Sequence, residues 1–278
     1  MNGLLVFMTD FGLDDGAISA MEGVSYCVSR ELNIRHLTHN IPPYNIFDAS
    51  YRLYQAINYW PEGTVFVCVV DPGVGSKRKS IVAKTLSNQY IVTPDNGTLT
   101  HIDKQIGIAE VRQISEKTNR LKNSELSYTF HGRDVYAYTG ARLACETISF
   151  EQVGDSLPVE DIVRLELFGT RKIENGILGQ IDILDVRFGS LWTSIPYEEF
   201  KNCGFNIGDD ILVEIFHEDK KVYSNRINYG KSFADVGIME PLIYMNSAYD
   251  MAVALNQGSF SQAYNIGTGY GWTITMTR

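Results

Sequence analysis

The chain has 278 residues, of which 44% are hydrophobic and 12% aromatic, enough to bury the core of one large domain or two ordinary ones. Its formal net charge of -9 and its pI near 5.1 disfavour nucleic acid as a partner, because binding a phosphate backbone requires clustered lysine and arginine. No apolar run approaches the roughly 20 residues that span a bilayer, so we expect no membrane insertion.

The N-terminal residues and the cysteines indicate no export. Residues 1–8 lack a basic segment followed by a long apolar region and a small-residue cleavage site, which predicts a cytoplasmic protein. The cysteines are scattered and form no C-x-x-C pair that would bind zinc or exchange thiols. We expect Cys27, Cys68, Cys145 and Cys203 to be ordinary core or surface side chains.

The first half of the chain alternates short apolar runs with helical patterns. Residues 4–8 are typical of a strand and residues 16–28 of an amphipathic helix. Apolar residues then recur at helical spacing from Ile46 to Ile57, and a Pro-Glu-Gly break precedes a buried-looking strand over residues 64–70. This order of elements predicts an α/β domain with a central, mostly parallel sheet.

Further along, two strands are expected over residues 80–86 and 89–93, followed by a turn at 94–97 and a helix beginning at Asp134. From about Gly176 the pattern changes to short strands separated by Gly, Asn and Asp turns. This change predicts a smaller all-β, barrel-like C-terminal domain. With a boundary between residues 155 and 172, the α/β domain covers residues 1–160 and the barrel domain residues 173–278.

Polar residues directly follow the first strand, in the segment TDFGLDDG at residues 9–16. They lie where open α/β sheets bind ligands, and the carboxylate of Asp10 can accept two hydrogen bonds from a ribose diol. Alternatively, Asp14 or Asp15 caps the next helix through backbone N–H groups. Three carboxylates this close also suggest a divalent metal site.

A second polar segment, DPGVGSKR at residues 71–78, follows the buried strand at 64–70. Its glycines allow the backbone to approach a ligand closely, but both the third glycine of a dinucleotide loop and the Gly-Lys-Ser/Thr ending of a phosphate loop are absent. Asp71 and Arg78 belong to a functional site or, alternatively, form a plain surface ion pair.

The third segment, TFHGRD at residues 129–134, precedes the helix expected from Asp134. It places His131 on a loop, where reactive groups are often positioned. A lone histidine is more often structural, and Asp134 is a plausible helix cap, so this segment gains meaning only beside the other two.

Taken together, the three segments resemble the signature of the SAM hydroxide adenosyltransferases, which are related to fluorinases and chlorinases that use S-adenosylmethionine (SAM). The similarity continues through Pro94-Asp95-Asn96-Gly97, residues 185–193, Ser232-Phe233-Ala234-Asp235 and Asn246-Ser247, and so covers both expected domains. It implies an enzyme that hydrolyses SAM to adenosine and methionine, with SAM as substrate and no cofactor.

The hydrolase branch of this family carries an Asp, Arg and His set, which corresponds here to Asp71, Arg78 and His131. The halogenases have a tyrosine at the aspartate position, and the fluorinase has a serine where this chain has Gly132. Carboxylate, guanidinium and imidazole suit the orientation and deprotonation of water, whereas a halide nucleophile needs an uncharged, hydrogen-bonding pocket. The resemblance therefore favours the hydrolase branch.

The same resemblance implies a set of substrate contacts. It assigns Asp10 to the ribose, Asp15 to the methionine end, and Tyr44 to the pocket lining. In the second domain it assigns Asp185 and Ser247 to the methionine amine and its surroundings, and Phe233, Gln257 and Ser190 to the adenine.

Two positions depart from the family pattern: Ser190 replaces the asparagine of Phe-Gly-Asn, and Ala248 replaces a fluorinase arginine. The resemblance further implies a homotrimer, in which the α/β domain of one subunit and the barrel of its neighbour enclose the substrate.

The expected reaction is in-line attack of water at C5' of the ribose, from which methionine leaves as a neutral thioether. Asp71 or His131 would take the proton, the two groups being coupled, and Arg78 would stabilise the developing hydroxide, without a metal. Two alternatives remain: a divalent-metal phosphohydrolase that uses the acidic cluster with His131, and a non-catalytic adenosine- or SAM-binding protein.

Overall fold

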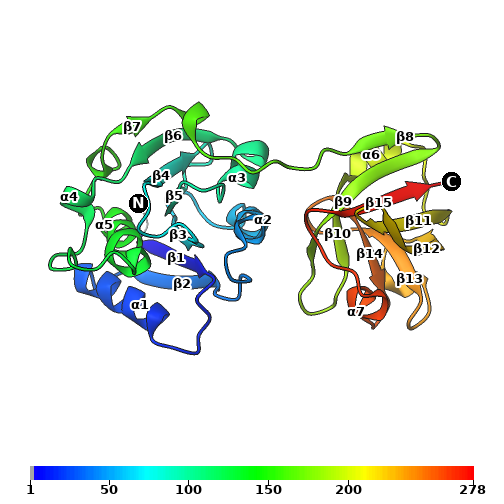
Figure 1. Ribbon diagram of the computed structural model, residues 1–278, viewed down its shortest axis with the longest axis horizontal. Helices are drawn as coiled ribbons and strands as arrows, with labels where there is room; N and C mark the ends of the chain where they lie inside the picture. Colours follow the sequence, from blue (N-terminus) through cyan, green and yellow to red (C-terminus); the bar gives the residue numbers. More distant parts are fainter. Residues whose placement is uncertain (1–2) are drawn as a thin grey trace. The chain divides into compact units, whose positions relative to one another are not determined.

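The computed structural model describes residues 3–278, so Met1 and Asn2 of the segment tested for a leader lie outside the described residues. The chain divides into two compact units, with the division between Leu165 and Glu166. Each unit has its own sheet and its own buried core (Figure 1).

The first unit alternates strands and helices. Its elements are β1 (Leu4–Thr9), α1 (Ala17–Val28), β2 (Asn33–Thr38), α2 (Ile46–Ile57), β3 (Val65–Val69), β4 (Ser80–Thr85), β5 (Tyr90–Pro94), α3 (Thr100–Gln105), β6 (Ile108–Gln113), α4 (Glu116–Asn119), η1 (Gly132–Ala137), α5 (Tyr138–Ala144), η2 (Glu151–Val153), β7 (Ser156–Leu157) and η3 (Val159–Asp161). The strands and helices expected before residue 94 are confirmed.

The sheet of the first unit has the strand order β2-β1-β3-β5-β4-β6-β7. Strands β2, β1, β3 and β5 are parallel, while β4, β6 and β7 continue the sheet with antiparallel pairings. The sheet is thus mixed, with the expected parallel core. Because β1 and β3 are neighbours in register, Thr9 beside Val69, the loops after both strands leave the same edge of the sheet.

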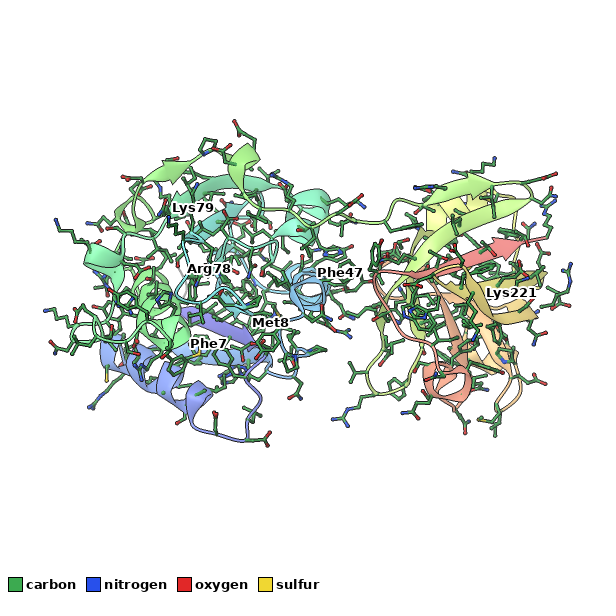
Figure 2. All side chains as sticks on the ribbon, viewed as in Figure 1. Phe7, Met8, Phe47, Arg78, Lys79 and Lys221 are labelled. Atoms are coloured by element: carbon green, nitrogen blue, oxygen red, sulfur yellow. The ribbon has the colours of Figure 1, made fainter. Side chains whose placement is uncertain are left out.

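Both faces of this sheet are buried, as a parallel core requires. Phe7 on β1 packs into the cluster that contains α1, η1 and α5, and its neighbour Met8 packs into the opposite cluster with α2 and α3 (Figure 2). The alternation of side chains along a strand explains this division of one apolar run between two helical layers.

The helix expected to begin at Asp134 begins earlier and with a different geometry. Residues Gly132–Ala137 form a π-helical turn, η1, which continues into α5. Asp134 is not the cap; it lies inside this turn, fully buried, and its carboxylate pairs with Arg133 at 2.6 Å. Single π-helical turns within α-helices are frequent at functional sites, and this one begins directly after His131.

The second unit is built mainly of strands. Its elements are β8 (Arg171–Ile173), β9 (Gly176–Leu184), β10 (Leu191–Pro196), α6 (Tyr197–Asn202), β11 (Asp210–His217), β12 (Lys220–Tyr229), η4 (Phe233–Asp235), β13 (Pro241–Met245), β14 (Asp250–Leu255), α7 (Phe260–Tyr264) and β15 (Trp272–Thr277). The strand order is β10-β14-β13-β12-β11-β15-β9-β8, and a pairing of β10 with β9 closes a barrel.

The interior of this barrel holds the core of the second unit. Along β11 buried and less buried residues alternate, so that Ile211, Val213 and Ile215 point into one cluster with Phe200 and Phe260. The expected barrel-like domain is confirmed, with two short helices, α6 and α7, added to it. None of the helices within residues 3–278 combines the length and apolar character needed to cross a bilayer.

Candidate active site

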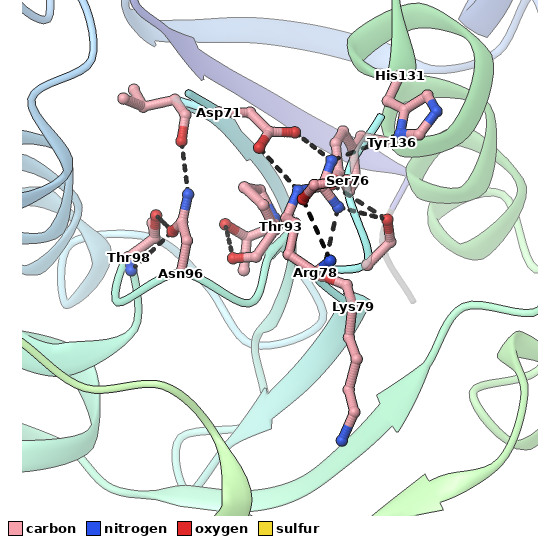
Figure 3. Close-up of polar contacts among 12 residues, drawn as sticks. Asp71, Ser76, Arg78, Lys79, Thr93, Asn96, Thr98, His131 and Tyr136 are labelled. Carbon is pink, nitrogen blue, oxygen red and sulfur yellow. Dashed lines mark hydrogen bonds and ion pairs between the residues drawn. The ribbon is translucent and has the colours of Figure 1, made fainter. Parts of the chain in front are cut away.

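Asp71, directly after β3, and Arg78 form a largely buried, bidentate ion pair. Arg78 Nε donates to Asp71 Oδ1 at 2.7 Å, and Nη2 donates to the other carboxylate oxygen (Figure 3). The Arg78 side chain is 12% exposed and that of Asp71 5%. The alternative of a plain surface ion pair is therefore wrong, because a surface pair would be hydrated on both partners.

The remaining contacts of Arg78 hold the guanidinium in one orientation. Nη1 donates to Ser80 Oγ at 2.9 Å and to the Lys79 carbonyl at 3.4 Å. Ser80 Oγ also contacts the Tyr136 hydroxyl at 3.1 Å, and the ring of Tyr136 lies 5.5 Å from the Arg78 guanidinium carbon. Strand β4 and the π-helical turn thus fix the arginine that aligns Asp71.

His131 completes this cluster from the segment before η1. The side chain is 5% exposed, and its Nδ1 lies 3.4 Å from Arg78 Nη2 (Figure 3). Burial lowers the pKa of His131 below its ordinary value; the charges of Arg78 and Arg120 lower it further, while those of Glu116 and Asp71 oppose the change. The imidazole is accordingly uncharged near neutral pH, with a lone pair that can accept a proton.

Close packing beside His131 explains the glycine that follows it. A Cβ on Gly132 would lie 3.1 Å from the Phe11 ring and 3.2 Å from the Phe130 ring. These two rings also contact each other edge to face, with centroids 6.0 Å apart. A side chain at this position would have to push the aromatic rings apart, so Gly132 allows the π-helical turn to approach the loop after β1.

A second ion pair, which the sequence did not predict, contacts His131. Arg120 Nη1 lies 3.5 Å from the imidazole Nε2 and donates to Glu116 Oε2 at 2.5 Å. The spacing of four residues between Glu116 and Arg120 is a visible helical signal. Nothing in that spacing shows that the pair faces a histidine eleven positions further along the chain.

Asp10 follows β1 and already has one partner. Its Oδ2 accepts the backbone N–H of Tyr44 at 2.8 Å, which leaves Oδ1 for another donor. Tyr44 has a positive φ of 67° and its side chain is exposed. The contact ties the loop after β1 to the segment before α2, and so presents Asp10 and Tyr44 together.

Asp15 hydrogen-bonds to the start of α1, as the capping alternative predicts, although Gly16 occupies the N-cap position. Its Oδ1 accepts the backbone N–H of Ala17 at 2.8 Å, at the start of α1. Asp15 also lines a pocket of about 610 Å³ together with Phe11, Gly16, Ala17, Thr129 and Phe130. Helix capping and exposure to a pocket are thus combined in one side chain.

The acidic residues of the first unit do not form a chelating cluster. In the part of the chain that the structure describes, no three histidine, cysteine, aspartate or glutamate side chains are grouped so as to hold a metal ion. The carboxylates of Asp15 and Asp71 instead bind a backbone N–H and an arginine.

In the second unit, two of the expected substrate residues share a pocket. Phe233 and Gln257 line a cavity of about 680 Å³ with Arg187, Phe188, Leu255, Asn256, Gly258 and Ser259. Gln257 adopts a positive φ of 57°, which is uncommon for a residue other than glycine and shapes the turn after β14. A lining that combines aromatic and aliphatic side chains with side-chain amides suits a flat heterocycle.

The other expected residues of this unit lie outside that lining. Asp185 accepts the backbone N–H of Arg187 at 3.3 Å, and thereby shapes the loop that carries Phe188. Ser190 is buried, with 2% of the residue exposed. Ser247 is exposed in the turn between β13 and β14.

Both units match domains of one protein family. The family model of the SAM hydroxide adenosyltransferase N-terminal domain matches residues 5–154, and that of the C-terminal domain matches residues 179–273. These two matches include every candidate residue named above.

Curated relatives include hydrolases and fluorinases. The chain is 36% identical to an (R)-S-adenosyl-L-methionine hydrolase of Methanocaldococcus jannaschii, over 78% of this chain and 74% of that protein. It is 30% identical to a protein of the same name from Thermus thermophilus, with coverage of 95% and 96%. Identity to a fluorinase of Actinopolyspora mzabensis is 24%, with coverage of 99% and 97%.

Among solved structures, a conserved protein from Thermotoga maritima resembles this chain with a TM-score of 0.89 and 33% identity, over 99% of this chain and 100% of that one.

Proposed function

We propose that this chain, which belongs to the SAM hydroxide adenosyltransferase family, hydrolyses S-adenosyl-L-methionine to adenosine and L-methionine. The observation that carries the proposal is the Asp71 and Arg78 ion pair beside the buried imidazole of His131, whose pKa is lowered by burial. A fixed carboxylate and a neutral imidazole are proton acceptors, and the arginine between them stabilises negative charge on oxygen.

The reaction requires a stronger nucleophile rather than a better leaving group. Water oxygen forms the new bond to C5' of the ribose, and the C5'–S bond breaks with its electron pair left on sulfur. The sulfonium becomes a neutral thioether, so methionine departs without being protonated. One proton of the water must leave the site, and the site has only to orient that water and accept this proton.

The residues of the cluster divide these tasks. Arg78 aligns the Asp71 carboxylate through two hydrogen bonds and faces the developing hydroxide with the rest of its charge. Asp71 and His131 contact the same guanidinium, so they are coupled and we assign the departing proton to the pair.

Substrate binding is proposed to use residues of both units. Asp10 holds the ribose hydroxyls through its free oxygen, Asp15 lies toward the methionine end, and the ring of Tyr44 covers the sugar. Phe233 and Gln257 hold the adenine in the pocket of the second unit, with Ser190 as a buried support. Asp185 and Ser247 bind the methionine amine.

A homotrimer with sites between subunits is proposed with this assignment, and sedimentation equilibrium of the purified protein tests it. The cytoplasmic location expected from the sequence remains a prediction, to be tested by fractionation of cells that express the protein.

The test of function is product analysis in labelled water. Incubation with SAM in halide-free buffer made with ¹⁸O-water should yield equal amounts of adenosine and methionine, with the label at the 5'-hydroxyl of adenosine. Unlabelled adenosine would refute attack by water. No product at all would identify a binding protein, and 5'-chloro-5'-deoxyadenosine as the main product in chloride buffer would identify a halogenase.

A further inference from the structure

The guanidinium of Arg120 is held from several sides next to His131. Only 8% of the residue is exposed. Nη1 donates to Glu116 Oε2 at 2.5 Å, and Nη2 donates to the Ser127 carbonyl at 2.7 Å and the Ser124 carbonyl at 3.4 Å. The ring of Tyr128 lies 4.7 Å from the guanidinium carbon. A group with this many anchors is fixed in position.

Both ring nitrogens of His131 face an arginine. Arg78 Nη2 lies 3.4 Å from Nδ1, and Arg120 Nη1 lies 3.5 Å from Nε2. A guanidinium only donates hydrogen bonds, and a protonated imidazole also only donates. The neutral imidazole has one lone pair and can accept a hydrogen bond from one of these two arginines. Protonation of His131 would remove that acceptor, and would set donor against donor and positive charge against positive charge at both ends of the ring.

We infer that Arg120 is a positioning residue for the proposed hydrolysis, which fixes the His131 ring and disfavours its protonated form so that the imidazole meets the attacking water uncharged. This inference rests on the proposed function. The proton of the water passes to the pair of Asp71 and His131 and then to solvent, because an imidazolium between two arginines is a poor place for it to stay.

The charges around His131 are balanced two against two. Asp71 pairs with Arg78 on the Nδ1 side, and Glu116 pairs with Arg120 on the Nε2 side. Burial lowers the pKa of His131. The negative charges of Glu116 and Asp71 raise this pKa, and the positive charges of the two arginines lower it. Removing Arg120 should therefore raise the pKa of His131, whereas neutralising Glu116 should lower it further.

The direct test is titration of His131 by NMR in the full-length protein. The chain has five histidines, and the His131 signal is the one lost in His131→Asn. In Arg120→Met the midpoint of this signal should rise, and in Glu116→Gln it should fall. Arg120→Lys, which retains the charge, should stay close to wild type.

A matched control is available in Arg112. This arginine binds Glu110 at 2.5 Å and the Gly154 carbonyl at 3.1 Å, and lies 5.3 Å from the ring of Phe150. It therefore has the same three kinds of contact as Arg120, but within residues 3–278 none of these contacts is with His131. Arg112→Met should leave both the His131 titration and SAM turnover unchanged.

Kinetics supply the second measurement. Since His131 acts uncharged, the acid limb of the kcat/KM profile should move to higher pH in Arg120→Met and to lower pH in Glu116→Gln. A purely structural role of Arg120 would lower activity at all pH values without moving the limb, and would overturn the inference.

Arg120→Met removes several buried hydrogen bonds, so that the variant could fail to fold. If that variant does not fold, Glu116→Gln decides the matter, since the Glu116 side chain is 38% exposed and only its charge is removed. An unmoved His131 titration in folded, active variants would refute the role of Arg120 alone. Failure of wild-type protein to hydrolyse SAM would refute the proposed function, whatever the titration shows.

Discussion

Asp71→Asn tests the buried ion pair through stability and turnover at once. The asparagine keeps the shape of the side chain but leaves the Arg78 charge without its partner, and Arg78 is only 12% exposed. Breaking a buried pair in this way lowers the free energy of unfolding by about 3–5 kcal/mol, because the remaining charge is poorly hydrated. Turnover of SAM should fall by roughly a hundredfold or more, since a positioned proton acceptor is lost.

Asp103→Asn is the matched control within the same unit. Asp103 pairs with Arg164 at 2.7 Å, but the side chains are 23% and 36% exposed. Loss of this ion pair should lower the free energy of unfolding by no more than about 1 kcal/mol and leave turnover of SAM unchanged.

Urea unfolding of the first unit measures the difference between these two variants. Trp60 lies in this unit, against Phe66, and can report on it alone when Trp192 and Trp272 of the second unit are replaced by phenylalanine. If Asp71→Asn were no less stable than Asp103→Asn, the ion pair of Asp71 and Arg78 would contribute no more to stability than an exposed one. If it also kept normal turnover, the assignment of Asp71 to the chemistry would be wrong.

Binding and chemistry should fail separately in two further variants. Asp10→Ala should weaken adenosine binding by about ten- to a hundredfold, because it removes charge-assisted hydrogen bonds worth roughly 1.5–3 kcal/mol, as calorimetry would measure. His131→Ala should leave adenosine binding within a few-fold of wild type while single-turnover rates fall by roughly a hundredfold; near-normal turnover would return His131 to a structural role. The first unit should lose stability as pH falls from 6.5 towards 4, because burial lowers the pKa of both His39 and His101 to about 4 and the unfolded chain then binds protons that the folded unit does not. Urea midpoints at pH 7 and pH 5 measure this, and equal values would contradict it. EDTA should leave activity unchanged, and loss of activity with rescue by magnesium or manganese would support the phosphohydrolase alternative instead.

The pattern of the sequence was enough to predict most local elements. Period-2 and period-3.6 patterns with Gly and Pro breaks located β1, α1, α2, β3, β4 and β5, because these signals arise from nearby residues. The sequence predicts that the helix after His131 begins at Asp134, because aspartate is a common α-helix cap. A π-helical turn has no such local signal, because it depends on how Tyr136, Gly132 and their neighbours pack against distant segments.

The antiparallel part of the sheet shows how local and distant factors combine. The sequence predicts strands over residues 80–86 and 89–93, and the turn between β4 and β5, with Asn88 at a positive φ, joins them in a hairpin. Strand β5 rather than β4 pairs with β3, which only the packed sheet decides.

The sequence by itself determined which residue types are available for chemistry and where they follow the strands. Asp10 and Asp71 come after apolar runs that become neighbouring parallel strands, and the three polar segments together resemble the family to which the chain belongs. The tertiary structure alone decided that the Asp71 and Arg78 pair is buried, and that Arg120 reaches the free side of His131. Burial and the approach of a charge across space depend on long-range packing, which the spacing of residues along a chain does not encode.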